Sequence, residues 1–166
     1  KGFDVLFEAW VQVIDQRPDA KLTVVGVGDA APWQAYLAGH AKASESVTFM
    51  GRLDDPYEAY LGAGVFVLPS RVEGMSNALL EAQSSGLACV VSDIPGNRAV
   101  VSHDVNGLTV PVGDAGALAE GMLRLLGDTD LRARLGHAAR EHMEQRFGLA
   151  RVVDQLTDLY RSLVEN

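Results

Sequence analysis

Two carboxylates eight positions apart, Glu73 and Glu81, are the most informative chemical groups in this sequence. They belong to the stretch S-R-V-E-G-M-S-N-A-L-L-E, which spans residues 70–81. Each carboxylate offers two acceptor oxygens, which suits the hydroxyl groups of a sugar. Between them, Gly74 is expected to allow a tight turn, and Ser76 to cap a helix whose first N–H groups face outward. A free helix start attracts an anion, typically a phosphate.

The spacing of these groups predicts the shape of a ligand. Asn77 and Glu81 are four positions apart, so they lie on one helix face, about 6 Å from each other along the axis. A phosphate at the helix start with hydroxyls on either side matches this layout, and a nucleotide-sugar has that shape. The alternative is that Glu73 caps a helix and Glu81 is a solvated helix residue. The pair is not interpreted as the acid and base of a hydrolase, because no neighbouring group positions a water.

Alternating strands and helices are expected to position these groups. Short apolar runs predict buried parallel strands, and apolar residues at helical spacing predict helices. The predicted strands cover residues 21–27, 47–50, 65–68, 88–92 and 107–110. The predicted helices cover residues 3–16, 32–43, 56–61, 76–85 and 97–101, then pieces from residue 115 onward that break near 127–128 and 147–148. The pattern predicts an α/β fold, a three-layer Rossmann-like parallel sheet with helices on both faces.

The bulk composition bounds the class of protein. The 166 residues fit one domain, 1–166, with a C-terminal helix over 149–166. A net charge of −8 argues against a nucleic-acid partner. Cys89 lies in an apolar run and is expected in the core, and no 18-residue apolar run predicts a membrane span. The histidines show no metal-binding spacing, so no metal is expected: His40, His103, His137 and His142.

The same stretch carries a resemblance to a known family. Together with S-S-G-L-A-C-V-V-S-D-I-P-G-N after it, it resembles the donor half of a retaining glycosyltransferase, and the closest resemblance is to glycosyltransferase family four. Members of that family have two Rossmann-like domains of the GT-B type. The resemblance implies that Glu73 contacts the transferred sugar and that Glu81 holds the ribose. It also implies that the turn and helix start between them bind substrate, namely Gly74, Met75, Ser76, Asn77 and Ala78.

Further contacts follow from the resemblance. Lys1 matches a lysine that meets the donor diphosphate, and Gly28 belongs to a glycine-rich turn that lines the cleft. Arg52 and Leu53 match a segment that lies against the nucleotide base. Each of these has an ordinary alternative, namely a solvated terminal lysine, a tight strand-to-helix turn and a surface arginine. Arg71 is expected to form a surface ion pair.

Some features depart from the family's pattern. In the family a strand precedes the first helix, and this chain has none, so we expect upstream residues or another segment in its place. Ala99 stands where the family often has a glutamate, and the aromatic residue usual near Ala150 is absent. The family's last helix crosses toward the other domain. Here its apolar stripe consists of Val152, Val153, Leu156, Leu159, Tyr160 and Leu163.

The sequence thus predicts the donor-binding, C-terminal half of a two-domain enzyme. Its partners are expected to be a nucleotide-sugar and, through the other domain, an acceptor glycan, lipid or small molecule. No cofactor is expected beyond the nucleoside-diphosphate sugar donor. This half alone is expected to be inactive. A cytoplasmic location is expected, with peripheral membrane attachment through the other domain left open. The alternative is a non-catalytic nucleotide-binding or scaffolding domain with the same fold.

Overall fold

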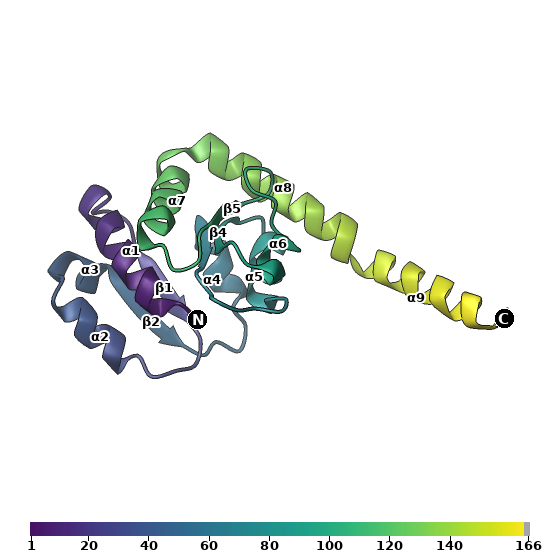
Figure 1. The fold of residues 1–166 in the computed structure, drawn as a ribbon, viewed down its shortest axis with the longest axis horizontal. Helices are drawn as coiled ribbons and strands as arrows, with labels where there is room; N and C mark the ends of the chain where they lie inside the picture. Colours follow the sequence, from purple (N-terminus) through teal and green to yellow (C-terminus); the bar gives the residue numbers. More distant parts are fainter. Residues whose placement is uncertain (165–166) are drawn as a thin grey trace.

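Strands and helices alternate along most of the chain, as the apolar pattern predicts. The computed structural model describes residues 1–164. The strands are β1 (Leu22–Val25), β2 (Val47–Gly51), β3 (Val65–Leu68), β4 (Ala88–Ser92) and β5 (Leu108–Val110). The helices are α1 (Phe3–Gln16), α2 (Ala31–Ala38), α3 (Ala41–Ser46), α4 (Tyr57–Leu61), α5 (Asn77–Ser84), α6 (Pro95–Arg98), α7 (Ala115–Gly127), α8 (Thr129–Phe147) and α9 (Leu149–Val164). Figure 1 shows their arrangement.

The five strands form two separate parallel sheets. One contains β1 and β2, and the other has the order β3-β4-β5. Within residues 1–164, β1 and β3 are not paired with each other. The arrangement is therefore not one closed five-stranded sheet, which agrees with the expectation that a strand of the family's sheet is lacking.

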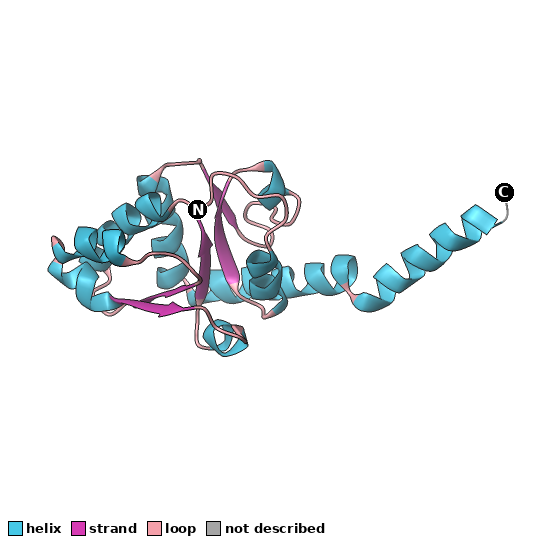
Figure 2. Ribbon diagram, turned by 90° about the horizontal axis from the view of Figure 1, so that it is seen from below, coloured by secondary structure: helices cyan, strands magenta, loops and turns pink. Residues whose placement is uncertain are grey.

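Helices cover both faces of the three-stranded sheet, which gives the expected three layers (Figure 2). Side chains of a strand alternate between its faces. Ala88 and Val90 of β4 lie in the core cluster that includes residues of α1 and α7, whereas Cys89 and Val91 lie in the cluster with residues of α5 and α8. All four are buried. The expectation that Cys89 is a core residue is confirmed.

Two predicted helices differ from the observed ones. Residues 32–43 do not form one helix: His40 leaves the helical conformation with φ −132° and ψ 82°, and this separates α2 from α3. The N–H groups of Gly39 and His40 instead close tight turns on Tyr36 and Leu37. The short helix predicted over 97–101 is observed as α6, which begins at Pro95, a residue whose fixed φ suits a first helical turn.

The chain ends in three helices that break where the sequence predicts. In Figure 1 α8 crosses the domain and α9 runs on away from the strands. The stripe residues that are described on α9 are exposed: Val153, Leu156, Tyr160 and Leu163. The side chains of Val152 and Leu159, and residues 165–166 of the predicted helix, lie outside the described part of the chain. None of the described helices has the length and apolar composition that a membrane span requires.

Candidate donor site

The turn that follows β3 brings three polar side chains together. Ser70 is fully buried, and its hydroxyl donates a 2.7 Å hydrogen bond to Oε1 of Glu73. The ammonium of Lys1 lies 2.5 Å from the same oxygen. The structure therefore brings together two of the predicted site residues, Lys1 and Glu73, and adds Ser70, to which the sequence analysis assigns no role.

Lys1 reaches Glu73 because the start of α1 is pressed against the end of β3. Gly2 adopts φ +77°, and a Cβ there would lie 2.1 Å from the carbonyl oxygen of Pro69, so no other residue fits without displacement. Next to this contact, Arg71 and Asp4 form a bidentate ion pair, in which Nη1 of Arg71 lies 2.9 Å from Oδ1 of Asp4. The expectation of a surface ion pair for Arg71 is confirmed, and the pair fixes the turn to α1.

Glu73 is held as a carboxylate. Its side chain is only 12% exposed. Partial burial raises its pKa, but the hydrogen bonds from Lys1 and Ser70 and the positive charge of Lys1 lower it more, so the pKa lies below the ordinary value of 4.5. A carboxylate with one oxygen occupied in this way keeps its other oxygen, Oε2, for a ligand hydroxyl.

The glycine that this turn requires is Gly96 rather than Gly74. A Cβ on Gly96 would lie 2.2 Å from the carbonyl oxygen of Gly74 and 2.3 Å from that of Glu73. A Cβ on Gly74 would meet nothing within 4 Å, and Gly74 has no positive φ. The chain bends at Gly74 as expected, but the bend does not depend on a conformation that favours glycine. The first turn of α6 therefore packs on the backbone of the Glu73 turn, and the glycine after Pro95 was the available signal in the sequence.

Helix α5 begins where the sequence predicts, at Asn77 after Ser76, but Ser76 does not cap it. Ser76 has extended backbone angles, yet its side chain makes no capping hydrogen bond. Among residues 1–164, the N–H groups of Asn77 and Ala78 also have no hydrogen-bond acceptor. The first turn of α5 therefore keeps free donors and the positive end of the helix dipole, as a phosphate site requires.

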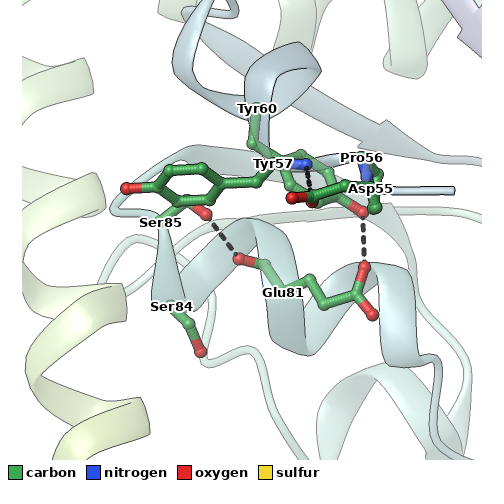
Figure 3. Close-up of a pocket in the computed structure, with 7 residues that line it drawn as sticks. All are labelled: Asp55, Pro56, Tyr57, Tyr60, Glu81, Ser84 and Ser85. Atoms are coloured by element: carbon green, nitrogen blue, oxygen red, sulfur yellow. Dashed lines mark hydrogen bonds between the residues drawn. The ribbon is translucent and has the colours of Figure 1, made fainter. Parts of the chain in front are cut away.

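Glu81 lies one turn further along α5, at the rim of a pocket. The pocket has a volume of about 340 Å³, and its walls come from the segment before α4, from α4 and from α5 (Figure 3). The lining residues are Asp55, Pro56, Tyr57, Tyr60, Glu81, Ser84 and Ser85. The hydroxyl of Tyr60 donates a 2.9 Å hydrogen bond to Oε2 of Glu81. Tyr60 is not among the residues predicted from the sequence, because a tyrosine on a short helix has the same pattern as a core aromatic.

Comparison with known proteins identifies the family. Residues 1–128 match the family described as glycosyl transferases group 1. The chain belongs to this family. It is similar to the GDP-mannose-dependent monoacylated alpha-(1-6)-phosphatidylinositol monomannoside mannosyltransferase of Corynebacterium glutamicum, at 34% identity over 98% of this chain and 44% of that protein. The chain thus spans less than half the length of this curated relative.

Solved structures give the same fold. Sucrose-phosphate synthase from Thermosynechococcus elongatus is 30% identical, with a TM-score of 0.80 over 96% of this chain and 42% of its own. The Anabaena protein HepE, in complex with UDP, is 22% identical, with a TM-score of 0.84 over 98% of this chain and 45% of its own. These likenesses confirm the predicted α/β fold, which is that of one half of a GT-B glycosyltransferase.

The remaining predicted site residues of this group 1 glycosyl transferase domain lie in the loops that follow the two strands of the smaller sheet. Gly28 follows β1, and Arg52 and Leu53 follow β2. The N–H of Gly26 donates to the carbonyl of Gly51 at 2.8 Å, so the two loops run side by side. No hydrogen bond or ion pair within the described residues joins Gly28, Arg52 or Leu53 to the two glutamates. Their contact with a donor stays a prediction.

No metal site is visible in the described part of this domain. Residues 1–164 contain no cluster of three or more His, Cys, Asp or Glu side chains that could hold an ion. The polar groups described at the site are two carboxylates, the ammonium of Lys1, the hydroxyls of Ser70 and Tyr60, and free backbone donors. Met75 beside the turn is half exposed, and Val72 is more so. Together these groups offer both polar and apolar surface to a bound donor.

Proposed function

We propose that this chain is the donor-binding, C-terminal half of a retaining glycosyltransferase of family four. The whole enzyme moves a sugar from a nucleoside-diphosphate sugar to an acceptor. The observation that carries this proposal is the contact of Glu73 with Lys1 in the turn before the uncapped start of α5, with Glu81 one turn further along that helix at the rim of a pocket. The relative from Corynebacterium glutamicum is named as GDP-mannose-dependent, and HepE was crystallised with UDP, which supports a nucleotide donor.

In this proposal the diphosphate lies against the N–H groups of Asn77 and Ala78. Those donors and the ammonium of Lys1 stabilise the negative charge that develops on the leaving diphosphate. Lys1 is suited to this because its side chain is 65% exposed and an ammonium has three donors, of which Glu73 takes one. Lys1 then bridges Glu73 and the diphosphate.

Glu73 and Glu81 have separate tasks in the proposal. Glu73 accepts hydrogen bonds from hydroxyls of the transferred sugar, and its ionised state gives those bonds extra strength. Glu81 accepts from the ribose, and Arg52 and Leu53 lie against the base. The proposal assigns no metal to the donor, and the helix start and Lys1 offset part of the diphosphate charge.

The acceptor belongs to the rest of the proposed enzyme. It is a glycan, a lipid or a small molecule, and it enters a cleft between two domains. The chain described here therefore binds nucleotide but transfers nothing by itself. Sugar transfer catalysed by the purified 166-residue chain alone would overturn this part of the proposal.

Calorimetric titration of the chain with UDP, GDP and ADP tests the donor site. We expect saturable binding of one of the three, and a loss of about tenfold in its affinity in the Glu81→Ala variant. The absence of binding to all three nucleotides would contradict the proposal. Equal binding of donor by Glu73→Ala and by the unchanged chain would instead favour a non-catalytic nucleotide-binding domain.

A further inference from the structure

We propose that Tyr60 is a positioning residue for Glu81, and that it sets the domain's preference for nucleotides that carry ribose hydroxyls. Tyr60 holds Oε2 of Glu81, so that Oε1 is left to accept from a ribose hydroxyl. This inference rests on the proposed function, because it assigns the pocket beside Glu81 to the nucleoside part of the donor.

The position of Tyr60 is fixed by the core rather than by solvent. Its ring packs edge-to-face on Phe66 of β3, with centroids 6.2 Å apart and an angle of 66° between the planes. Both rings lie against the buried cluster that contains Leu79 and Cys89. Helix α4, which carries Tyr60, begins at a turn closed by a 2.9 Å bond from the N–H of Tyr57 to Oδ1 of Asp55. The hydroxyl of Tyr60 is therefore presented at a defined place.

Glu81, by contrast, depends on Tyr60 for its orientation. Its side chain is exposed, and among the described residues its carboxylate has no ion pair and no hydrogen-bond donor other than Tyr60. Ser85 bonds only the backbone carbonyl of Glu81, at 2.9 Å. Without Tyr60, a long and flexible side chain would sample several rotamers, and that freedom would be lost on binding.

Tyr60 stays a donor across the physiological pH range. Burial raises the pKa of its hydroxyl, and the adjacent Glu81 carboxylate raises it further. The hydroxyl therefore remains protonated and donates to Glu81 without competition from its own ionisation. A hydrogen bond to a charged acceptor is stronger than one between neutral groups, so the carboxylate is held firmly.

The pocket fits the nucleoside part of a donor in size and chemistry. Its volume of about 340 Å³ falls within the usual range for small-molecule sites. Figure 3 shows Tyr57 and Tyr60 over one side of it and Glu81 across from them. Aromatic rings offer flat apolar surface to a base, while Glu81 and Ser84 offer oxygens to the sugar. The free oxygen of Glu81 is thus the group that distinguishes a ribose from a sugar without hydroxyls.

The test compares two ligands on matched variants. The ligands are the nucleoside diphosphate that binds most tightly among UDP, GDP and ADP, and its 2′,3′-dideoxy analogue. We expect the unchanged chain to prefer the ribonucleotide, and Tyr60→Phe to reduce that preference about tenfold with little change in affinity for the dideoxy analogue. A residue with a purely structural role would change both affinities by the same factor.

Tyr57→Phe is the matched control, because it removes a hydroxyl from the same helix and the same pocket without touching Glu81. We expect it to leave the ratio of the two affinities as it is. A preference that survives in Tyr60→Phe but is lost in Glu81→Ala would overturn the inference and leave the proposed function standing. If the unchanged chain binds none of the three nucleotides, the proposed function fails and the inference fails with it.

Discussion

The ammonium of Lys1 lies 2.5 Å from Oε1 of Glu73, although the two residues are 72 positions apart in the chain. The contact exists because Gly2 presses the start of α1 against Pro69, at the end of β3. It joins the first residue of the chain to the turn that carries the proposed sugar-binding carboxylate. The positive charge and the negative charge of the site are therefore positioned together, before any ligand binds.

This pair predicts an effect of Lys1 on the ionisation of Glu73. The Lys1→Met variant is expected to raise the pKa of Glu73 toward its ordinary value, because the largest lowering contribution is the Lys1 hydrogen bond. Since the folded pKa is lowered, the stability that the pair contributes is present above pH 4.5 and is lost as the pH falls through the lowered pKa. Carbon-detected NMR titration of the Glu73 carboxyl group measures this.

Lys21→Met provides the control for that titration. Lys21 is exposed and has no ion pair among the described residues, so its removal changes the net charge equally without touching Glu73. A pKa of Glu73 that rises by the same amount in both variants would show that net charge, rather than the contact, governs its ionisation.

Gly96 is predicted to be more important for the site than Gly74. Gly96→Ala places a methyl group 2.2 Å from the carbonyl oxygen of Gly74, and backbone atoms must shift to accept it. We expect a loss of about 1–3 kcal/mol in the free energy of unfolding, measured by urea denaturation. Gly74→Ala meets open space and is expected to change that free energy by less than about 0.5 kcal/mol. The reverse order of the two effects would contradict the packing described here.

These glycines show where prediction from the sequence stops. The runs at 65–68 and 88–92 give the strands at their observed positions, because β4 is fully buried and β3 partly buried on both faces, which leaves a continuous apolar pattern. Predictions from short sequence patterns failed where contacts between distant segments determine the local conformation. Ser76 has the residue type of a cap but forms no capping bond, and the glycine required at the turn is Gly96, which lies in a different element, helix α6.

The candidate site was likewise predictable only in part, because some of its contacts join residues that are far apart in the chain. Glu73 and Glu81 were singled out by residue type and spacing, and Lys1 by a family resemblance, and the structure then showed the contact between Glu73 and Lys1. Tyr60 could not be found in this way, because its partner Glu81 lies 21 positions later and on a different helix. Only the folded arrangement of α4 against β3 and α5 reveals that its hydroxyl faces a carboxylate.

Cys89 is predicted to be inert toward thiol reagents in the folded protein. It is fully buried in β4, and burial raises the pKa of its thiol, so almost no thiolate is present at neutral pH. We expect a disulfide reagent such as Ellman's reagent to modify the native chain far more slowly than the chain in concentrated urea, followed by absorbance. Similar rates in the two conditions would contradict the burial of β4.

The ion pair between Asp4 and Arg71 predicts how the stability of the fold depends on pH in acid. The hydrogen bond from Arg71 is the main cause that lowers the pKa of Asp4 to about 2. The pair therefore contributes stability above the ordinary pKa of 3.8, and this contribution is lost as the pH falls toward about 2. In acid denaturation, Asp4→Asn should lack the fall in stability that accompanies protonation of Asp4. In the unchanged chain, 1 M salt should make that fall smaller.

Asp54→Asn is the control for the acid titration, since Asp54 is exposed and has no ion pair among the described residues. It should retain the pH dependence of the unchanged chain between pH 4 and pH 2. If Asp4→Asn and Asp54→Asn showed the same dependence of stability on pH between pH 4 and pH 2, the link between α1 and the Glu73 turn would not be an electrostatic one.

In the proposed function, Glu73 binds the transferred sugar and Glu81 binds the nucleoside. The most direct measurement is calorimetric titration of Glu73→Gln and Glu81→Gln with a nucleoside diphosphate and with the matching nucleotide-sugar. We predict that Glu81→Gln weakens both ligands about equally, whereas Glu73→Gln weakens the nucleotide-sugar about tenfold more than the nucleoside diphosphate. Binding of the nucleotide-sugar by both variants with the affinity of the unchanged chain would contradict the account.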